Sequence, residues 1–434
     1  MIVCDFLVRN VRQLVNPARD DVVRGRELNS VRLQPRAWLA AEKGIIRFVG
    51  SEREFAERCS LRPGAEVIDG SDFIALPGFV DPHTHLPFAG TRQDEFRQKL
   101  QGVSYQEIAR GGGGIKQTVR LTRAILEDDL LAACMHRLDH MLLQGTTTAE
   151  AKSGYGLDRE SELKQLQVLQ RLRPLHPLEV VPTFMAAHEI PDEFKGCARE
   201  YLDFILAEIA PEVRQRELAE FCDIFCEEGY FSFADSDYYL GKMAANGFKI
   251  KVHADEFSSN GAATLAVRHD ARSAEHLIAI SEEEISAIAP SATAAILLPG
   301  VSFFLKLGRF APARRIIAQD GILALGTDFN PGSSMVSSQL FVFHLGIFLL
   351  GLTIAEAINA VTVNAAYAID RQLQAGSLIP GKKMDALLLD IPDYSYLGYH
   401  LGIQPVHTVI KSGKVVVRDR RLAYSRGDSA ANQM

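Results

Sequence analysis

The sequence has few cysteines and no segment typical of secretion. Its 434 residues include six scattered cysteines, Cys4, Cys59, Cys134, Cys197, Cys222 and Cys226. The first residues, 1–5, are not a basic segment followed by an apolar one, as a secretory signal would be. We therefore expect a cytoplasmic protein with reduced thiols rather than a disulfide framework. Cys222 and Cys226 lack a second cysteine pair, so they are a weak zinc signal.

Long apolar runs and an excess of basic charge are also lacking. The longest apolar run, 340–352, is interrupted by His344 and is shorter than the ~20 residues that a membrane-spanning helix needs. Acidic residues number 54 against 47 basic ones, which gives a net charge of -7, and no basic stripe is present. This composition argues against a membrane or a nucleic acid as partner. The 47% of hydrophobic residues can fill the core of one large domain plus a smaller one.

Short strand patterns lie at both ends of the chain and predict one small β domain assembled from residues 1–69 and 376–434. They occur at 6–9, 37–40, 44–50, 66–70, 386–390 and 406–417. Between the two ends, over 70–375, apolar strand candidates alternate with helical stretches. The strand candidates are 146–149, 180–185, 223–226, 249–253, 273–276, 294–298 and 323–327, and the helical stretches include 125–143, 158–172 and 282–288. This alternation predicts the α/β class with a parallel sheet.

We expect that sheet to close into a (β/α)₈ barrel, as in triosephosphate isomerase, because residues able to do chemistry follow several of its strands. An open sheet would collect its site near a glycine-rich first turn, and no Gly-x-Gly-x-x-Gly follows a first strand. The four glycines 111–114 are not followed by Lys-Ser or Lys-Thr, so they do not match a phosphate-binding loop. We interpret them as a mobile loop and leave open whether it acts as a lid.

The most informative segment is 77–85, which ends in His83-Thr84-His85. In an extended strand, residues two apart point to the same face, so both imidazoles could bind one metal ion. Alone, this pair could equally be a solvated strand end. His253, His276 and Asp328 also lie at the ends of short apolar segments, which favours a metal site at the barrel mouth.

The chain resembles the amidohydrolase superfamily and, within it, the imidazolonepropionase family. The resemblance spans nearly the whole chain and is carried by the segments 77–85 with 88–92, 146–157, 183–188, 253–256, 273–276, 297–300 and 326–334. The His-x-His pair and Asp328 indicate the superfamily only. Lys-Ser-Gly-Tyr-Gly at 152–156 and Asp-Phe-Asn-Pro-Gly-Ser at 328–333 indicate the family.

The resemblance implies a barrel flanked by a β-sandwich built from both termini. It also implies one zinc or iron ion per subunit, held by His83, His85, His253 and Asp328. Superfamily members with two metal ions carry a bridging lysine where this chain has His188, which favours one ion. The implied activity is hydrolysis of the cyclic amide of 4-imidazolone-5-propionate to N-formimino-L-glutamate, a step of histidine degradation.

Further residues receive expected roles in this chemistry. Glu256, His276 and Asp328 are candidates for moving protons or stabilising the oxyanion, and which of them moves each proton stays open. Arg92 could bind the substrate carboxylate with two parallel hydrogen bonds. The other candidates for substrate contacts are Tyr105, Tyr155, His188, Glu256, Asn330, Gly332 and Ser333. For the last three, backbone N–H groups or a simple turn are the alternatives.

Two other functions are compatible with the same residues. A deaminase of an aminated heterocycle could use His253, Glu256 and His276 to attack an amidine carbon. The chain could also be an inactive scaffold, but that hypothesis predicts lost metal ligands. Composition does not separate zinc from iron. Barrel helices often pair between subunits, so a homodimer is one oligomeric state that the sequence allows.

Overall fold

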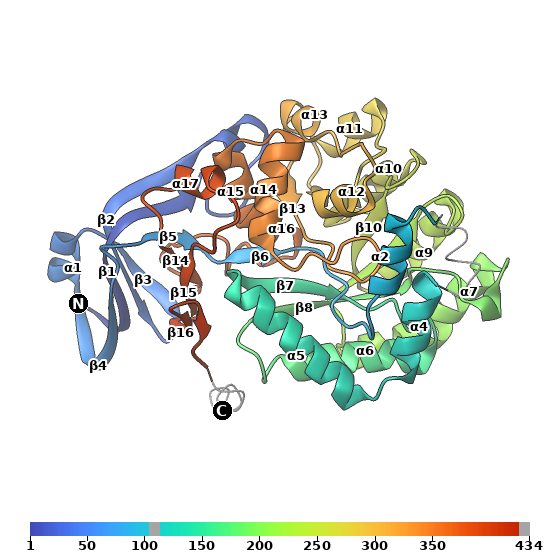
Figure 1. Cartoon of the computed structure of the whole chain (residues 1–434), viewed down its shortest axis with the longest axis horizontal. Helices are drawn as coiled ribbons and strands as arrows, with labels where there is room; N and C mark the ends of the chain where they lie inside the picture. Colours follow the sequence, from blue (N-terminus) through green and yellow to red (C-terminus); the bar gives the residue numbers. More distant parts are fainter. Residues whose placement is uncertain (104–112, 425–434) are drawn as a thin grey trace.

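The computed structural model of the chain describes residues 1–103 and 113–424. Figure 1 shows a small sheet at one side of the molecule, where the N-terminus lies, and a larger barrel wrapped by helices at the other. Within the described residues, no helix is both long and apolar enough to cross a membrane.

The barrel consists of eight parallel strands, and strands that are consecutive in the sequence are neighbours in the sheet. They are β6 (Phe79–Asp81), β7 (Thr146–Lys152), β8 (Glu179–Ala187), β9 (Phe221–Cys226), β10 (Lys249–Ala254), β11 (Ser273–His276), β12 (Ala294–Leu297) and β13 (Leu323–Leu325). The residues of these strands are almost all buried, as expected for a parallel sheet covered by helices.

The barrel closes through segments that follow its first and last strands. Thr84 forms a parallel bridge with Phe329. The His85 amide donates to the Phe329 carbonyl at 3.0 Å, and the Asp328 amide donates to the His83 carbonyl at 3.0 Å. The predicted barrel is confirmed, and the backbone that closes it carries three of the expected metal ligands.

Helices cover the outside of the barrel and connect its strands. They are α2 (Gln93–Leu100), α4 (Ile115–Ala124), α5 (Glu127–Leu143), α6 (Arg159–Leu172), α7 (Ala198–Phe204), α8 (Ala210–Gln215), α9 (Phe233–Ala245), α10 (Ala262–Arg268), α11 (Glu282–Ile288), α12 (Pro299–Leu305), α13 (Ala313–Ala318), α14 (Gln339–Leu350), α15 (Ile354–Val361) and α16 (Val363–Ala368). Capping residues in the sequence mark where several of these helices begin. For example, α11 begins with a capping box between Ser281 and Glu284.

The second sheet has nine strands contributed by both ends of the chain. They are β1 (Ile2–Pro17), β2 (Val31–Glu42), β3 (Ile45–Gly50), β4 (Cys59–Asp69), β5 (Ile74–Pro77), β14 (Ala386–Leu389), β15 (Val406–Lys411), β16 (Lys414–Arg418) and β17 (Arg421–Leu422), with α1 (Glu52–Arg58) and α17 (Ser395–Tyr399) beside them. One apolar cluster joins side chains from β1, β2, β5 and β14. The predicted β domain from both termini is confirmed.

Strand β5 connects the two ends, because it pairs with β1 in parallel and with β14 antiparallel. This strand lies just beyond residue 69, where we place the end of the first part of the β domain. The division into 1–69 with 376–434 and 70–375 remains our proposal.

Candidate active site

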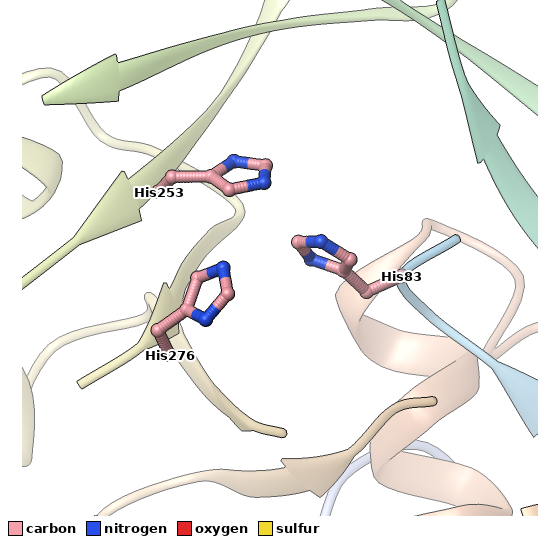
Figure 2. Close-up of side chains that lie close together, drawn as sticks. All are labelled: His83, His253 and His276. Atoms are coloured by element: carbon pink, nitrogen blue, oxygen red, sulfur yellow. The ribbon is translucent and has the colours of Figure 1, made fainter. Parts of the chain in front are cut away.

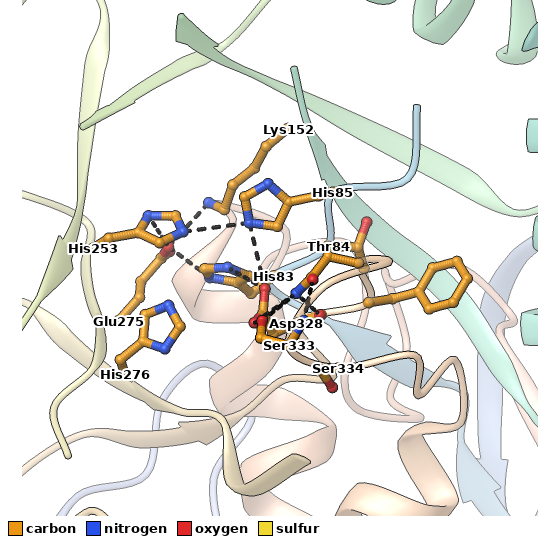
Figure 3. Close-up of polar contacts among 12 residues, drawn as sticks. His83, Thr84, His85, Lys152, His253, Glu275, His276, Asp328, Ser333 and Ser334 are labelled. Atoms are coloured by element: carbon orange, nitrogen blue, oxygen red, sulfur yellow. Dashed lines mark hydrogen bonds and ion pairs between the residues drawn. The ribbon is translucent and has the colours of Figure 1, made fainter. Parts of the chain in front are cut away.

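The expected metal ligands all lie where the barrel strands end. His83 and His85 follow β6, His253 is in β10, and Asp328 follows β13. Figure 3 shows these four side chains together. The Asp328 Oδ1 atom lies 3.2 Å from His83 Nε2 and 3.4 Å from His85 Nε2. His253 Nε2 lies 3.4 Å from His85 Nε2. A tetrahedral ion with bonds of ~2.0–2.1 Å separates its ligands by roughly 3.3–3.4 Å, and these three distances are close to that value. Ligand atoms of His83, His85 and Asp328 all lie within 4.8 Å of one another.

Two neighbouring carboxylates determine which ring nitrogens face the centre. His83 Nδ1 lies 2.6 Å from Glu275 Oε2, and His253 Nδ1 lies 3.0 Å from Asp223 Oδ2. A carboxylate beside Nδ1 favours the tautomer that carries its proton on this atom, which would leave Nε2 available to a cation at the centre. His83 Nε2 and Asp328 Oδ1 are buried and have no hydrogen-bond partner. A cluster of buried acceptors is what a bound cation would satisfy, and three imidazoles with one carboxylate suit zinc or iron.

His276 lies beside the proposed ligands, as Figure 2 shows. Nitrogen atoms of His276, His83 and His253 all lie within 4.8 Å of one another. Burial lowers the pKa of His276 to about 3, so its ring is neutral at pH 7. Its Nε2 atom lies 3.7 Å from Glu256 Oε2. The structure therefore brings together the two expected catalytic residues that follow β10 and end β11.

The carboxyl group of Glu256 lies in a low-polarity, negatively charged environment. Burial, followed by the charges of Asp328 and Glu227, raises its pKa well above the usual value. Glu227 also holds the segment after Glu256, because its Oε2 atom accepts from the Phe257 amide at 2.9 Å. A carboxyl group with a raised pKa can both donate and accept a proton near pH 7.

A cavity of about 670 Å³ opens above the ligands. It is lined by His85, His253, Glu256, His276 and Asp328, and also by the expected substrate-binding residues Arg92, Tyr155, His188, Asn330, Gly332 and Ser333. Its volume suits a small organic molecule.

Arg92 reaches this cavity from the residue before α2. Its Nε atom donates to Thr118 Oγ1 at 2.9 Å, which fixes the side chain against α4. A Cβ added to Gly332 would lie 2.5 Å from Arg92 Nη1. Glycine at 332 therefore leaves the space that the guanidinium occupies.

His188, which follows β8, presents a hydrogen-bond acceptor to the cavity. Burial and the neighbouring His85 lower its pKa to about 3. Its Nδ1 atom lies 3.0 Å from the Gly154 carbonyl, which can only accept, so Nδ1 is protonated and Nε2 carries a lone pair. Tyr155 lies next to it with ring centroids 5.3 Å apart, and burial raises the pKa of the Tyr155 hydroxyl.

The turn after Asp328 differs in detail from the expectation. The amides of Gly332 and Ser333 both donate to Asn330 Oδ1 at 2.8 Å, so they already have an acceptor within the turn. Asn330 Nδ2 donates to Asp328 Oδ2 at 2.9 Å, so the second oxygen of Asp328 is also engaged. The expected amide donors are thus used to hold Asp328 and its turn, as the turn interpretation predicts. Tyr105 and the first two glycines of 111–114 lie outside the described residues.

Sequence reasoning missed a set of charged side chains beneath the ligands. Glu150, Lys152, Asp223, Lys251 and Glu275 have fully buried side chains inside the barrel. Burial would lower the pKa of Lys152, but Asp223, Glu150 and Glu275 raise it well above the usual value. The available signal was the presence of charged residues within or directly after the strand candidates, at 150, 152, 223, 251 and 275.

Comparison with known proteins identifies the family. The chain is 43% identical over 414 residues to an imidazolonepropionase of Clostridium tetani, which covers 95% of this chain and 98% of that protein. It is 45% identical over 408 residues to an imidazolonepropionase of Rubrobacter xylanophilus, which covers 94% of this chain and 97% of that protein. The chain belongs to the imidazolonepropionase family. It is therefore a hydrolytic enzyme. In a separate comparison with family models, no model matches the chain.

Solved structures show the same fold at low identity. An adenosine deaminase from Xanthomonas campestris with bound zinc has a TM-score of 0.67 and 18% identity, covering 99% of this chain and 97% of that chain. A guanine deaminase from E. coli has a TM-score of 0.68 and 14% identity, covering 95% of this chain and 98% of that chain. These similarities confirm the amidohydrolase fold.

Proposed function

We propose that this chain hydrolyses 4-imidazolone-5-propionate to N-formimino-L-glutamate in histidine degradation. The observation that carries the proposal is one cavity lined by three of the proposed ligands, His85, His253 and Asp328, together with Arg92, in a chain of the imidazolonepropionase family. The substrate has a matching pair of groups, a cyclic amide to be cleaved and a carboxylate to be bound.

The residues that would hold the ion are His83, His85, His253 and Asp328. We propose one ion per subunit, zinc or iron, because His188 stands where a bridging lysine would be needed for a second ion. Such an ion, when bound, lowers the pKa of a coordinated water and polarises a carbonyl group.

We assign substrate binding to cavity residues that surround the proposed ligands. Arg92 binds the propionate carboxylate with its guanidinium, whose Nε atom is already held by Thr118. His188 Nε2 accepts a hydrogen bond from a ring N–H, because its Nδ1 proton is directed to Gly154. Tyr155 contributes an apolar ring face and a hydroxyl.

The proton transfers are assigned to the buried groups near the ligands. Water adds to the carbonyl carbon of the ring, and Asp328 or Glu256 accepts its proton. Neutral His276 donates a hydrogen bond to the oxygen on which negative charge develops. Glu256 then donates a proton to the ring nitrogen as the C–N bond breaks, which leaves the formimino group on the product.

The test is to supply 4-imidazolone-5-propionate to metal-loaded enzyme and to follow both products. We expect loss of imidazolone absorbance, formation of formimino-glutamate and no ammonia. Metal-free enzyme is the control and should be inactive. Ammonia release from an aminated heterocycle, without turnover of the imidazolone, would refute the proposal in favour of a deaminase. The cytoplasmic location and the homodimer stay predictions.

A further inference from the structure

Lys152 contacts three buried carboxylates at once. Its Nζ atom lies 2.8 Å from Glu150 Oε1, 2.8 Å from Asp223 Oδ2 and 3.0 Å from Glu275 Oε2. The three acidic residues belong to β7, β9 and β11, so one ammonium group bridges three strands. All four side chains are fully buried, where an unpaired charge would be costly.

Two of these carboxylates lie beside the Nδ1 atoms of proposed ligand imidazoles. Glu275 Oε2, which contacts Lys152, also lies 2.6 Å from His83 Nδ1. Asp223 Oδ2, which contacts Lys152 too, lies 3.0 Å from His253 Nδ1, and Asp223 Oδ1 accepts from the His253 amide at 3.2 Å. The same two oxygen atoms thus contact the ammonium group and the ligand rings (Figure 3 draws Lys152 and Glu275 beside them).

The third carboxylate holds the backbone between the first two ligands. Glu150 Oε2 accepts from the Thr84 amide at 3.2 Å, and Thr84 Oγ1 donates to the Glu150 carbonyl at 2.7 Å. Thr84 separates His83 from His85. Glu150 therefore orients the segment that carries both residues.

Lys251 has a narrower set of contacts. Its Nζ atom lies 2.8 Å from Glu275 Oε1 and donates to the Pro82 carbonyl at 2.9 Å. Lys251 therefore lies on the His83 side of the centre. Among the ion pairs of the described residues, none joins Lys251 to Asp223.

We propose that Lys152 is the positioning residue of the metal centre: it holds Glu150, Asp223 and Glu275 so that His83, His85 and His253 are oriented before the ion binds. The inference rests on the metal centre of the proposed function. Groups that orient metal ligands typically contribute about 10–100-fold to metal affinity.

The test measures zinc binding to metal-free protein by competition with a chromophoric chelator. Zinc alone is the probe, because N/O sites bind it more tightly than ferrous iron. We expect K152Q to bind zinc about 10–100-fold more weakly than the wild type. The matched control is K411Q, which removes another buried lysine, paired with Asp385 at 2.6 Å in the small sheet. It should lower stability and leave zinc affinity unchanged.

Absorption spectra of the cobalt-substituted proteins report the geometry of the metal ligands. A purely structural role of Lys152 would leave these spectra unchanged. K152Q should change the ligand-field bands, and K411Q should not. Wild-type zinc affinity and cobalt bands in K152Q would overturn the inference, as would an equal loss of affinity in K411Q. If K152Q does not fold, E150Q/K152Q, which removes one charge of each sign, decides by the same criteria. A wild type that binds no zinc would instead refute the metal centre itself.

Discussion

Replacing Arg92 by methionine tests how the substrate is held. Methionine keeps most of the apolar stem of the side chain and removes the guanidinium. We expect a higher KM and a lower kcat/KM with unchanged metal content, because Arg92 lines the cavity but is not among the ligand atoms.

The size of the effect follows from the environment of Arg92. Loss of one partner of a buried, hydrogen-bonded charge pair costs about 2–5 kcal/mol. Arg92 is only partly buried, so solvent screens its charge and the lower part of this range applies. A loss of about 2–3 kcal/mol corresponds to a decrease in kcat/KM of roughly 30–150-fold, at 1.36 kcal/mol per tenfold.

The assay compares the natural substrate with an analogue in which a neutral amide replaces the propionate carboxylate. The wild type should discriminate against the amide by roughly the same 30–150-fold, since the analogue lacks the charge that the guanidinium binds. The R92M enzyme should hardly discriminate between them. Steady-state kinetics on the four combinations gives the coupling between the guanidinium and the carboxylate.

Equal discrimination by both enzymes would show that Arg92 does not contact the carboxylate. G332A is the geometric control, because its added methyl group would lie 2.5 Å from Arg92 Nη1 and displace the guanidinium without removing its charge. Its loss of kcat/KM should be smaller than that of R92M, and it should keep part of the preference for the carboxylate.

Three further outcomes are expected. E256Q should retain metal and substrate binding but lose about 10²–10⁴-fold in kcat, and near-normal turnover would transfer the proton to Asp328 or His276. Metal analysis of active enzyme should give one ion per chain, and two equivalents would contradict the four-ligand centre. Burial would raise the pKa of Glu179, but Lys411 and two other cations lower this pKa to about 2. The charge of Glu179 therefore stabilises the fold above pH 4.5, and this stabilisation is lost as the pH falls toward 2. Urea unfolding should therefore find E179Q less stable by about 3 kcal/mol at pH 7 and by much less near pH 2, whereas a pH-independent difference would contradict the assignment.

The sequence predicted the barrel because its strands and helices leave local signals, whereas the proposed ligand set came from the resemblance to the family. Strand and helix lengths repeat along the chain, and the expected helix at 282–288 coincides with α11. The proposed ligands are imidazoles and a carboxylate at strand ends, where a barrel gathers its functional groups. One detail differed: His83 and His85 follow β6 rather than lie in it, and the contacts of Thr84 with Glu150 and Phe329 keep that segment extended.

Long-range pairings left no comparable signal. The contacts of Lys152 join residues 71 and 123 positions away, Asp223 and Glu275, and they depend on how three strands align across the barrel. The Arg92–Gly332 contact likewise joins the segments after the first and last strands. Each residue alone is an ordinary lysine, arginine or glycine, so composition and spacing do not predict these contacts.

Strand alternation also gives an incomplete prediction at β11. Adjacent residues of a regular strand point to opposite faces, so Glu275 and His276 should not both reach the barrel centre. They do, because His276 has a φ of 74° and its backbone is left-handed, which turns its side chain toward the proposed ligands His83 and His253. Asp328, three residues after the end of β13, has a φ of 49° and is also left-handed. Such conformations are costly for residues other than glycine and occur where the surrounding structure holds them for function. The strain at these two residues therefore falls on side chains of the proposed active site, and the periodicity of the sequence gives no signal of it.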